Sequence, residues 1–234
     1  MPPRQSKRKA TKTGDSTPSK LPHLDNIRSA SSKAASKKND NVDEFFRTYA
    51  NSLSDMIEPE GVERLCSDLN LDPTDVKVLM LAWKMKAEKQ GYFTQDEWQR
   101  GLKALKVDTI NKLKKSLPGL EKEVLKPDNF EDFYLYAFRY SLIEDKQKCI
   151  DIETACILLD IVLGSQFQIH VDLFKEFLQA QRDYKVINMD QWVNFYRFCK
   201  EIRFSDFEDY DASQAWPLIL DNFVDWMKEK TSQC

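Results

Sequence analysis

The sequence predicts an all-α fold, and two observations support this prediction. Glycine is scarce, with 6 residues in 234, while hydrophobic residues make up 41% of the chain. A composition low in glycine and rich in Leu, Lys and Glu is typical of helices and not of a turn-rich β-protein. From residue 42 onward, apolar residues recur at the spacing of one helix face, and no stretch alternates as a strand does over more than a few residues.

Each expected helix has a local signal. Val42, Phe45 and Tyr49 stand at helical spacing and open the first helix. Thr94 and Glu97 match a capping box, which starts another. A glycine at position 164 is expected to end the helix before it. The helices after the first are expected over residues 59–69, 76–88, 94–105, 109–117, 119–126, 127–140, 151–163, 168–182, 190–199 and 217–227.

Charge divides the chain into two parts. Residues 1–40 hold 10 Lys and Arg against 3 Asp and Glu, and the remainder holds 25 against 35. We expect residues 1–40 to be a disordered basic tail and residues 41–230 to form the folded domain. Within the tail, Lys7, Arg8 and Lys9 are candidates for a nuclear-localisation signal, although a solubilising tail explains them equally well.

The sequence lacks the signals of most catalytic and metal sites. Neither a phosphate-binding loop, a dinucleotide-binding motif nor a nucleophile elbow occurs. The five cysteines form no C-x-x-C pair, and the two histidines stand far apart. No run approaches the roughly 18 apolar residues of a membrane span. We therefore expect a soluble, intracellular protein that is not an enzyme and holds no cofactor or metal.

One calcium-binding motif is half present. Residues 86–97 align with an EF-hand loop, with Gly91 at the turn position and Glu97 at the bidentate position. Lys86, however, stands where the first carboxylate belongs and would place a positive charge beside the cation. A second candidate loop, residues 145–156, lacks both the glycine and the final glutamate. The pattern predicts helix–loop–helix units without functional calcium loops.

Four segments resemble the defective-in-cullin-neddylation family in their order and spacing. They are Leu71-Asp72-Pro73, Leu81-Ala82-Trp83-Lys84, Phe130-x-x-Phe133-Tyr134 and Ala215-Trp216-Pro217. The resemblance covers roughly residues 40–230 and implies two EF-hand-like helical halves packed as one potentiating-neddylation domain. The chain is most similar to the short, basic-tailed members that lack a ubiquitin-binding domain, which implies a nuclear as well as a cytoplasmic location.

The resemblance also implies a function. Members of this family are scaffold-type co-ligases that promote cullin neddylation by proximity and orientation. They bind the C-terminal winged-helix region of a cullin and the N-terminally acetylated neddylation conjugating enzyme, and they hold that enzyme near the RING subunit. The family's cullin-binding residues correspond to Asp190, Ala215 and Asp221. Without the resemblance, Asp190 is a helix cap and Asp221 a solvated helix residue.

A second site follows from the same resemblance. It is an apolar pocket for an acetylated N-terminal methionine, although an ordinary core has the same composition. By register the pocket is lined by Val62, Leu65, Pro73, Val78, Leu79, Ala82, Met85, Tyr140, Leu158 and Ile161.

Two other functions remain open from the sequence. An EF-hand-like adaptor without calcium would bind a partner helix in an apolar groove. A chromatin-associated protein would use the basic tail, but a tail without aromatic residues has no base-stacking surface.

Overall fold

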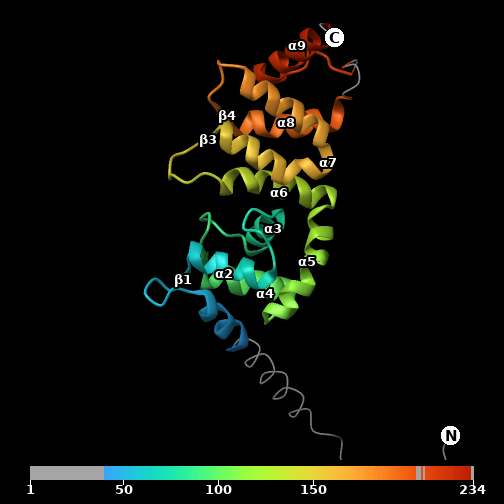
Figure 1. Cartoon of the computed structure of the whole chain (residues 1–234). Coiled ribbons are helices and arrows are strands. Elements are labelled where there is room, and N and C mark those ends of the chain that lie inside the picture. Colours follow the sequence, from blue (N-terminus) through green and yellow to red (C-terminus); the bar gives the residue numbers. More distant parts are fainter. Residues whose placement is uncertain (1–39, 204–206, 208, 233–234) are drawn as a thin grey trace, which may run out of the picture. The chain divides into compact units, whose positions relative to one another are not determined.

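The computed structural model describes residues 40–203, 207 and 209–232, which all belong to one compact unit. These residues are mostly helical, which confirms the predicted fold class (Figure 1). The nuclear-localisation candidates Lys7, Arg8 and Lys9 lie outside the described residues.

The described helices form two groups that α5 (Ile110–Val124) connects. In the first group, a helix over residues 40–49 precedes α2 (Pro59–Leu69), α3 (Val76–Met85) and α4 (Gln95–Leu105). The second group consists of α6 (Pro127–Tyr140), α7 (Ile152–Ala180), α8 (Met189–Glu201) and α9 (Leu218–Ser232). α5 contacts α2, α3 and α4 on one side and α6 on the other.

Each group contains one short antiparallel strand pair, which joins two of its loops. β1 (Met56–Ile57) pairs with β2 (Phe93–Thr94), and β3 (Cys149–Asp151) pairs with β4 (Val186–Asn188). Each strand is followed directly by a helix or by one residue and a helix. The sequence did not predict these strands, because two or three residues are too few to show alternation.

The two helices expected over residues 109–117 and 119–126 are one helix, α5, with Pro118 in its interior. Proline removes one backbone hydrogen bond and normally ends a helix. Here Pro118 is exposed, and apolar residues before and after it pack into the core and hold the helix together. These buried residues are Leu113, Leu117, Leu120 and Val124.

The helices expected over residues 151–163 and 168–182 are likewise joined, as α7. Gly164 does not end the first one, because it is buried and helical. The interruption falls at Phe167 instead, whose backbone is non-helical (φ −132°, ψ 43°). The Phe167 ring packs edge-on against His170 and Tyr196, so tertiary contacts and not the glycine place the kink.

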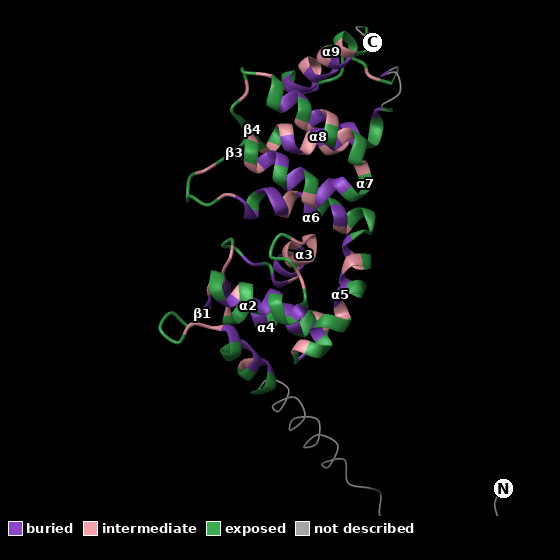
Figure 2. Ribbon diagram, in the orientation of Figure 1, coloured by how far each residue is buried: buried purple, intermediate pink, exposed green. Residues whose placement is uncertain are grey.

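By length and composition alone, α7 is the one described helix that is apolar enough to cross a membrane, with a mean hydropathy of 1.4 over an 18-residue window. Core helices of soluble proteins pass the same test. Apolar residues of α7 such as Leu159, Leu163 and Phe174 belong to the hydrophobic core, whereas Ile157 and Ile169 are exposed. Figure 2 shows the buried residues of this helix in purple.

Tyr134 of α6 and Trp192 of α8 form a reciprocal contact in the core. The Tyr134 hydroxyl donates to the Trp192 carbonyl at 2.9 Å, and the Trp192 indole N–H donates to the Tyr134 carbonyl at 3.1 Å. The two rings stack with centroids 4.6 Å apart. Both polar groups are thus satisfied inside the core, as buried donors require, and α6 and α8 are fixed side by side.

The loop between α3 and α4 is held by the carboxylate of Glu97, which is only 7% exposed. This carboxylate accepts the backbone N–H groups of Glu88 at 2.9 Å and Thr94 at 2.7 Å. α3 ends at Met85, three residues earlier than expected, and the backbone of the next residue, Lys86, is in the left-handed region (φ 54°). Gly91 also has a positive φ, 78°, which glycine adopts without strain.

In an EF-hand the corresponding glutamate binds calcium. Here the Glu97 carboxylate binds two backbone N–H groups of its own loop instead. We expect Glu97→Ala to lower the free energy of unfolding by about 1–3 kcal/mol, because it leaves two backbone donors without their acceptor. Denaturant unfolding followed by circular dichroism measures this loss. Asp96→Ala, at an exposed position in the same helical turn, should change stability by within about 0.5 kcal/mol. Stabilisation of the unmodified protein by millimolar calcium would contradict this account of the loop.

Candidate functional site

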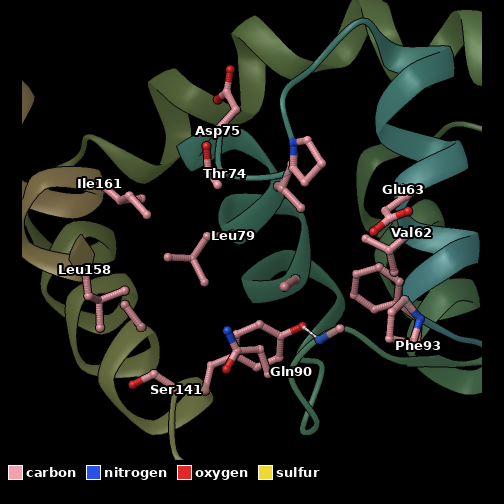
Figure 3. Close-up of a pocket in the computed structure, with 17 residues that line it drawn as sticks. Val62, Glu63, Thr74, Asp75, Leu79, Gln90, Phe93, Ser141, Leu158 and Ile161 are labelled. Carbon is pink, nitrogen blue, oxygen red and sulfur yellow. Dashed lines mark hydrogen bonds between the residues drawn. The ribbon is translucent and has the colours of Figure 1, made fainter. Parts of the chain in front are cut away.

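An apolar pocket of about 290 Å³ lies where α2, α3, α6 and α7 approach one another (Figure 3). Leu79 of α3 and Leu158 and Ile161 of α7 point into its interior. Val62 of α2 and Phe93 of β2 form another wall. The remaining lining residues are Pro59, Glu63, Pro73, Thr74, Asp75, Val78, Ala82, Gln90, Gly91, Ala137, Tyr140 and Ser141.

Eight of the ten residues that the family resemblance assigned to a pocket line this one. They are Val62, Pro73, Val78, Leu79, Ala82, Tyr140, Leu158 and Ile161. Leu65 and Met85 are not among the lining residues; they are 2% and 0% exposed and belong to the core. Met85 lies against Gly101 of α4, where a Cβ atom would come within 2.4 Å of its side chain. Its place at the α3–α4 contact explains why Met85 is not part of the pocket wall.

The rim of the pocket is polar, which the sequence did not predict. Glu63, Thr74, Asp75, Gln90 and Ser141 all contribute to the lining (Figure 3). Asp75 caps α3 by accepting the backbone N–H two residues later at 2.8 Å. The signal available in the sequence was Asp75, a residue type that favours helix N-caps and stands directly before α3.

Tyr140 connects the pocket to the Glu97-held loop. Its hydroxyl oxygen accepts the backbone N–H of Gly91 at 3.2 Å, drawn as a dashed line in Figure 3. Burial raises the pKa of Tyr140 to about 12. The phenol therefore stays protonated at neutral pH, and its hydrogen can be donated to an acceptor inside the pocket.

The structure places the three predicted cullin-binding residues on α8, on α9 and just before α9. Asp190 is exposed in the first turn of α8, where its carboxylate accepts the side-chain amide of Asn194 at 3.1 Å. Ala215 is exposed just before α9. Asp221 is partly exposed in the first turn of α9 and accepts the hydroxyl of Tyr210.

Contacts around Arg197 of α8 hold the segment before α9 against that helix. Its guanidinium group lies 4.1 Å from the centroid of the Trp216 ring and donates to the Gln214 side chain at 2.8 Å. Asp190 stands on the same face of α8, two turns earlier. The structure thus brings the Ala215 segment and α8 together, while no described contact joins Asp190 directly to Ala215 or Asp221.

Sequence reasoning missed Leu218 on this surface. It lies between Ala215 and Asp221 and is 66% exposed, which makes it an apolar residue within a polar surface. An exposed leucine beside acidic residues suits a protein contact with an apolar centre and a charged rim. Its position directly after the Ala215-Trp216-Pro217 motif was the available signal.

The pocket wall and the core should respond differently to the same truncation. We expect Leu65→Ala to cost about 2–5 kcal/mol of unfolding free energy, because it leaves a cavity in a closed core. Leu79→Ala should cost about half of that or less, since Leu79 already faces an open pocket. Denaturant unfolding of both variants tests this order; equal losses would place Leu79 in the core.

Comparison with known proteins assigns the family. A family model described as cullin binding matches residues 112–226. DCN1-like protein 4 of Homo sapiens is 37% identical over 98% of this chain and 78% of its own length. DCN1-like protein 5 of Homo sapiens is 35% identical over 79% of this chain and 76% of its own length. DCN1-like protein 4 of Drosophila melanogaster is 38% identical over 75% and 69%. The chain therefore belongs to the defective-in-cullin-neddylation (DCN1-like) family of cullin-binding proteins, as its motifs predicted.

Proposed function

We propose that this protein is a scaffold-type co-ligase that promotes the neddylation of cullins. The observation that carries the proposal is the position of the cullin-binding family model, whose match over residues 112–226 includes Asp190, Ala215 and Asp221. In this role the protein binds the C-terminal winged-helix region of a cullin through the α8–α9 surface. It has no catalytic side chain of its own and raises the rate by proximity and orientation.

The pocket is proposed to bind the acetylated N-terminal methionine of the neddylation conjugating enzyme. An unbranched thioether side chain fits an apolar pocket of irregular shape. The acetyl group removes the charge of the N-terminus, whereas a free ammonium group would lose its hydration among Val78, Leu79 and Leu158. The protonated hydroxyl of Tyr140 and the polar rim supply hydrogen-bonding partners for the acetyl group and the peptide backbone. The bound enzyme would then lie near the RING subunit of the cullin ligase.

The basic tail is proposed to place the protein in both nucleus and cytoplasm. Lys7, Arg8 and Lys9 supply the clustered positive charge that nuclear import signals contain. Imaging of a tagged protein in which alanine replaces these three residues tests the assignment.

Leu79→Arg tests the peptide pocket. We expect it to reduce the affinity for an acetyl-methionyl peptide by at least about tenfold, because it places a charge in an apolar cavity. Leu79 suits this test better than Ala82, which is 1% exposed and packed. The matched control is Ile143→Arg at a position 82% exposed and outside the pocket. Unchanged binding by Leu79→Arg, measured by calorimetry, would remove the pocket assignment.

Asp221→Asn tests the cullin surface without removing the acceptor for Tyr210. Loss of a central interface charge costs about 2–5 kcal/mol of binding free energy, so we expect Asp221→Asn to weaken cullin binding by at least tenfold. Adding Asp190→Asn and Ala215→Arg should abolish both binding and the stimulation of neddylation.

The control for the cullin surface is Glu229→Gln, an exposed position further along α9. It should bind a cullin C-terminal domain normally. The Asp221, Asp190 and Ala215 variants and this control should all retain binding of the acetyl-methionyl peptide. Normal cullin affinity in the triple variant would rule out this surface.

A further inference from the structure

A second cavity, of about 710 Å³, lies on a different face of α3 from the peptide pocket. We call it the basic cleft. α3, α4, α6 and the loop after α3 supply its walls. Its lining residues are Trp83, Lys84, Lys86, Ala87, Glu88, Arg100, Ala104, Asp132, Tyr136, Arg139 and Tyr140.

The charge of the basic cleft is opposite to the net charge of residues 41–234. Four basic and two acidic side chains line it, whereas residues 41–234 together hold 25 Lys and Arg against 35 Asp and Glu. Lys84 is committed to an ion pair with Glu123 at 2.5 Å. Arg100 donates to the Met85 carbonyl at the end of α3 at 3.1 Å.

The other two cations of the cleft, Lys86 and Arg139, are exposed and have no ion-pair partner among the described residues. They come from different elements, the end of α3 and the last turn of α6. Two cations without ion-pair partners on one cavity attract an anionic group. They can bind it without first breaking an ion pair within the protein.

Fixed aromatic rings form the rest of the cleft. The Trp83 indole N–H donates to the Asp132 carboxylate at 2.8 Å. Tyr136 donates its hydroxyl to the Ala87 carbonyl at 2.9 Å and stacks on Tyr140 with ring centroids 5.2 Å apart. These hydrogen bonds hold the rings in place, so an incoming apolar side chain meets a preformed wall.

We propose that the basic cleft binds an acidic peptide segment of a partner protein. A Glu or Asp of the peptide pairs with Lys86 and Arg139, and a neighbouring apolar residue packs on Trp83 and Tyr136. Nucleic acid fits less well, because its continuous row of phosphates would pass Glu88 and Asp132 as well as the two cations. A short peptide can place one carboxylate beside Lys86 and Arg139 alone. The proposal goes beyond the cullin and acetyl-methionine sites and does not depend on either.

The cleft is next to the peptide pocket. Tyr140 lines both cavities, and the loop from Lys86 to Gly91 contributes residues to each of them. A partner bound in one cavity can therefore extend toward the other along this loop. Such continuity favours a peptide over a free ion, which would occupy little of a cavity of this volume.

The experiment measures binding of a short fluorescein-labelled peptide of Glu and Phe residues to the full chain by fluorescence anisotropy at low salt. A peptide with Gln in place of Glu is the neutral control. The cleft variant is Lys86→Gln with Arg139→Gln. The matched variant is Lys115→Gln with Lys122→Gln, which removes the same charge from exposed positions on α5 that do not line the cleft.

We expect the cleft variant to lose about tenfold in affinity for the acidic peptide, while the matched variant changes by less than about twofold. Added salt should weaken binding, and the Gln peptide should bind poorly. Equal losses in both variants, no binding of the acidic peptide, or preferential displacement by a single-stranded oligonucleotide would each overturn the proposal. Acetyl-methionyl peptide binding, measured in the same cleft variant, should stay intact, so failure here is separate from failure of the peptide pocket.

Discussion

The carboxylate of Glu97 is the constraint on which both cavities depend. In an EF-hand loop the corresponding glutamate binds calcium, and the ion organises the loop. Here the same carboxylate accepts the backbone N–H groups of Glu88 and Thr94 and is almost fully buried. It ties the beginning of the loop to the start of α4 without a cation. Lys86, at the first ligand position, is therefore free to face the basic cleft.

Side chains of α6 complete this arrangement. Tyr136 donates to Ala87 and Tyr140 accepts from Gly91, so two successive turns of one helix hold both ends of the loop. Because the loop contributes to the pocket on one side and to the cleft on the other, a change in its path would alter both cavities together. The α3–α4 unit thus has a helix–loop–helix geometry that side-chain hydrogen bonds hold without a metal ion, and its loop contributes to two cavities.

Sequence reasoning predicted the helices well where a clear apolar periodicity decides the outcome, and less well where a single proline or glycine was taken as a helix end. Periodicity predicted α2 and α4, but Pro118 and Gly164 suggested helix ends that packing overrides in α5 and α7. Eight of the ten residues that the resemblance assigned to the pocket line it, and they make up eight of its seventeen lining residues. The sequence could not show that Leu65 and Met85 belong to the core and not to the pocket wall, because both are built from the same apolar residue types. The basic cleft gave no signal, since its cations come from three helices and become neighbours only on folding.

A scaffold that acts by proximity must keep its two binding surfaces at a fixed spacing, since small displacements reduce the gain from orientation. The reciprocal hydrogen bonds of Tyr134 and Trp192 meet this need. Tyr134 stands on α6, whose last turns include Ala137 and Tyr140 of the pocket wall. Trp192 stands on α8, two residues after Asp190. This buried pair therefore links the proposed enzyme-binding pocket to the proposed cullin surface through a core contact and not through a flexible loop.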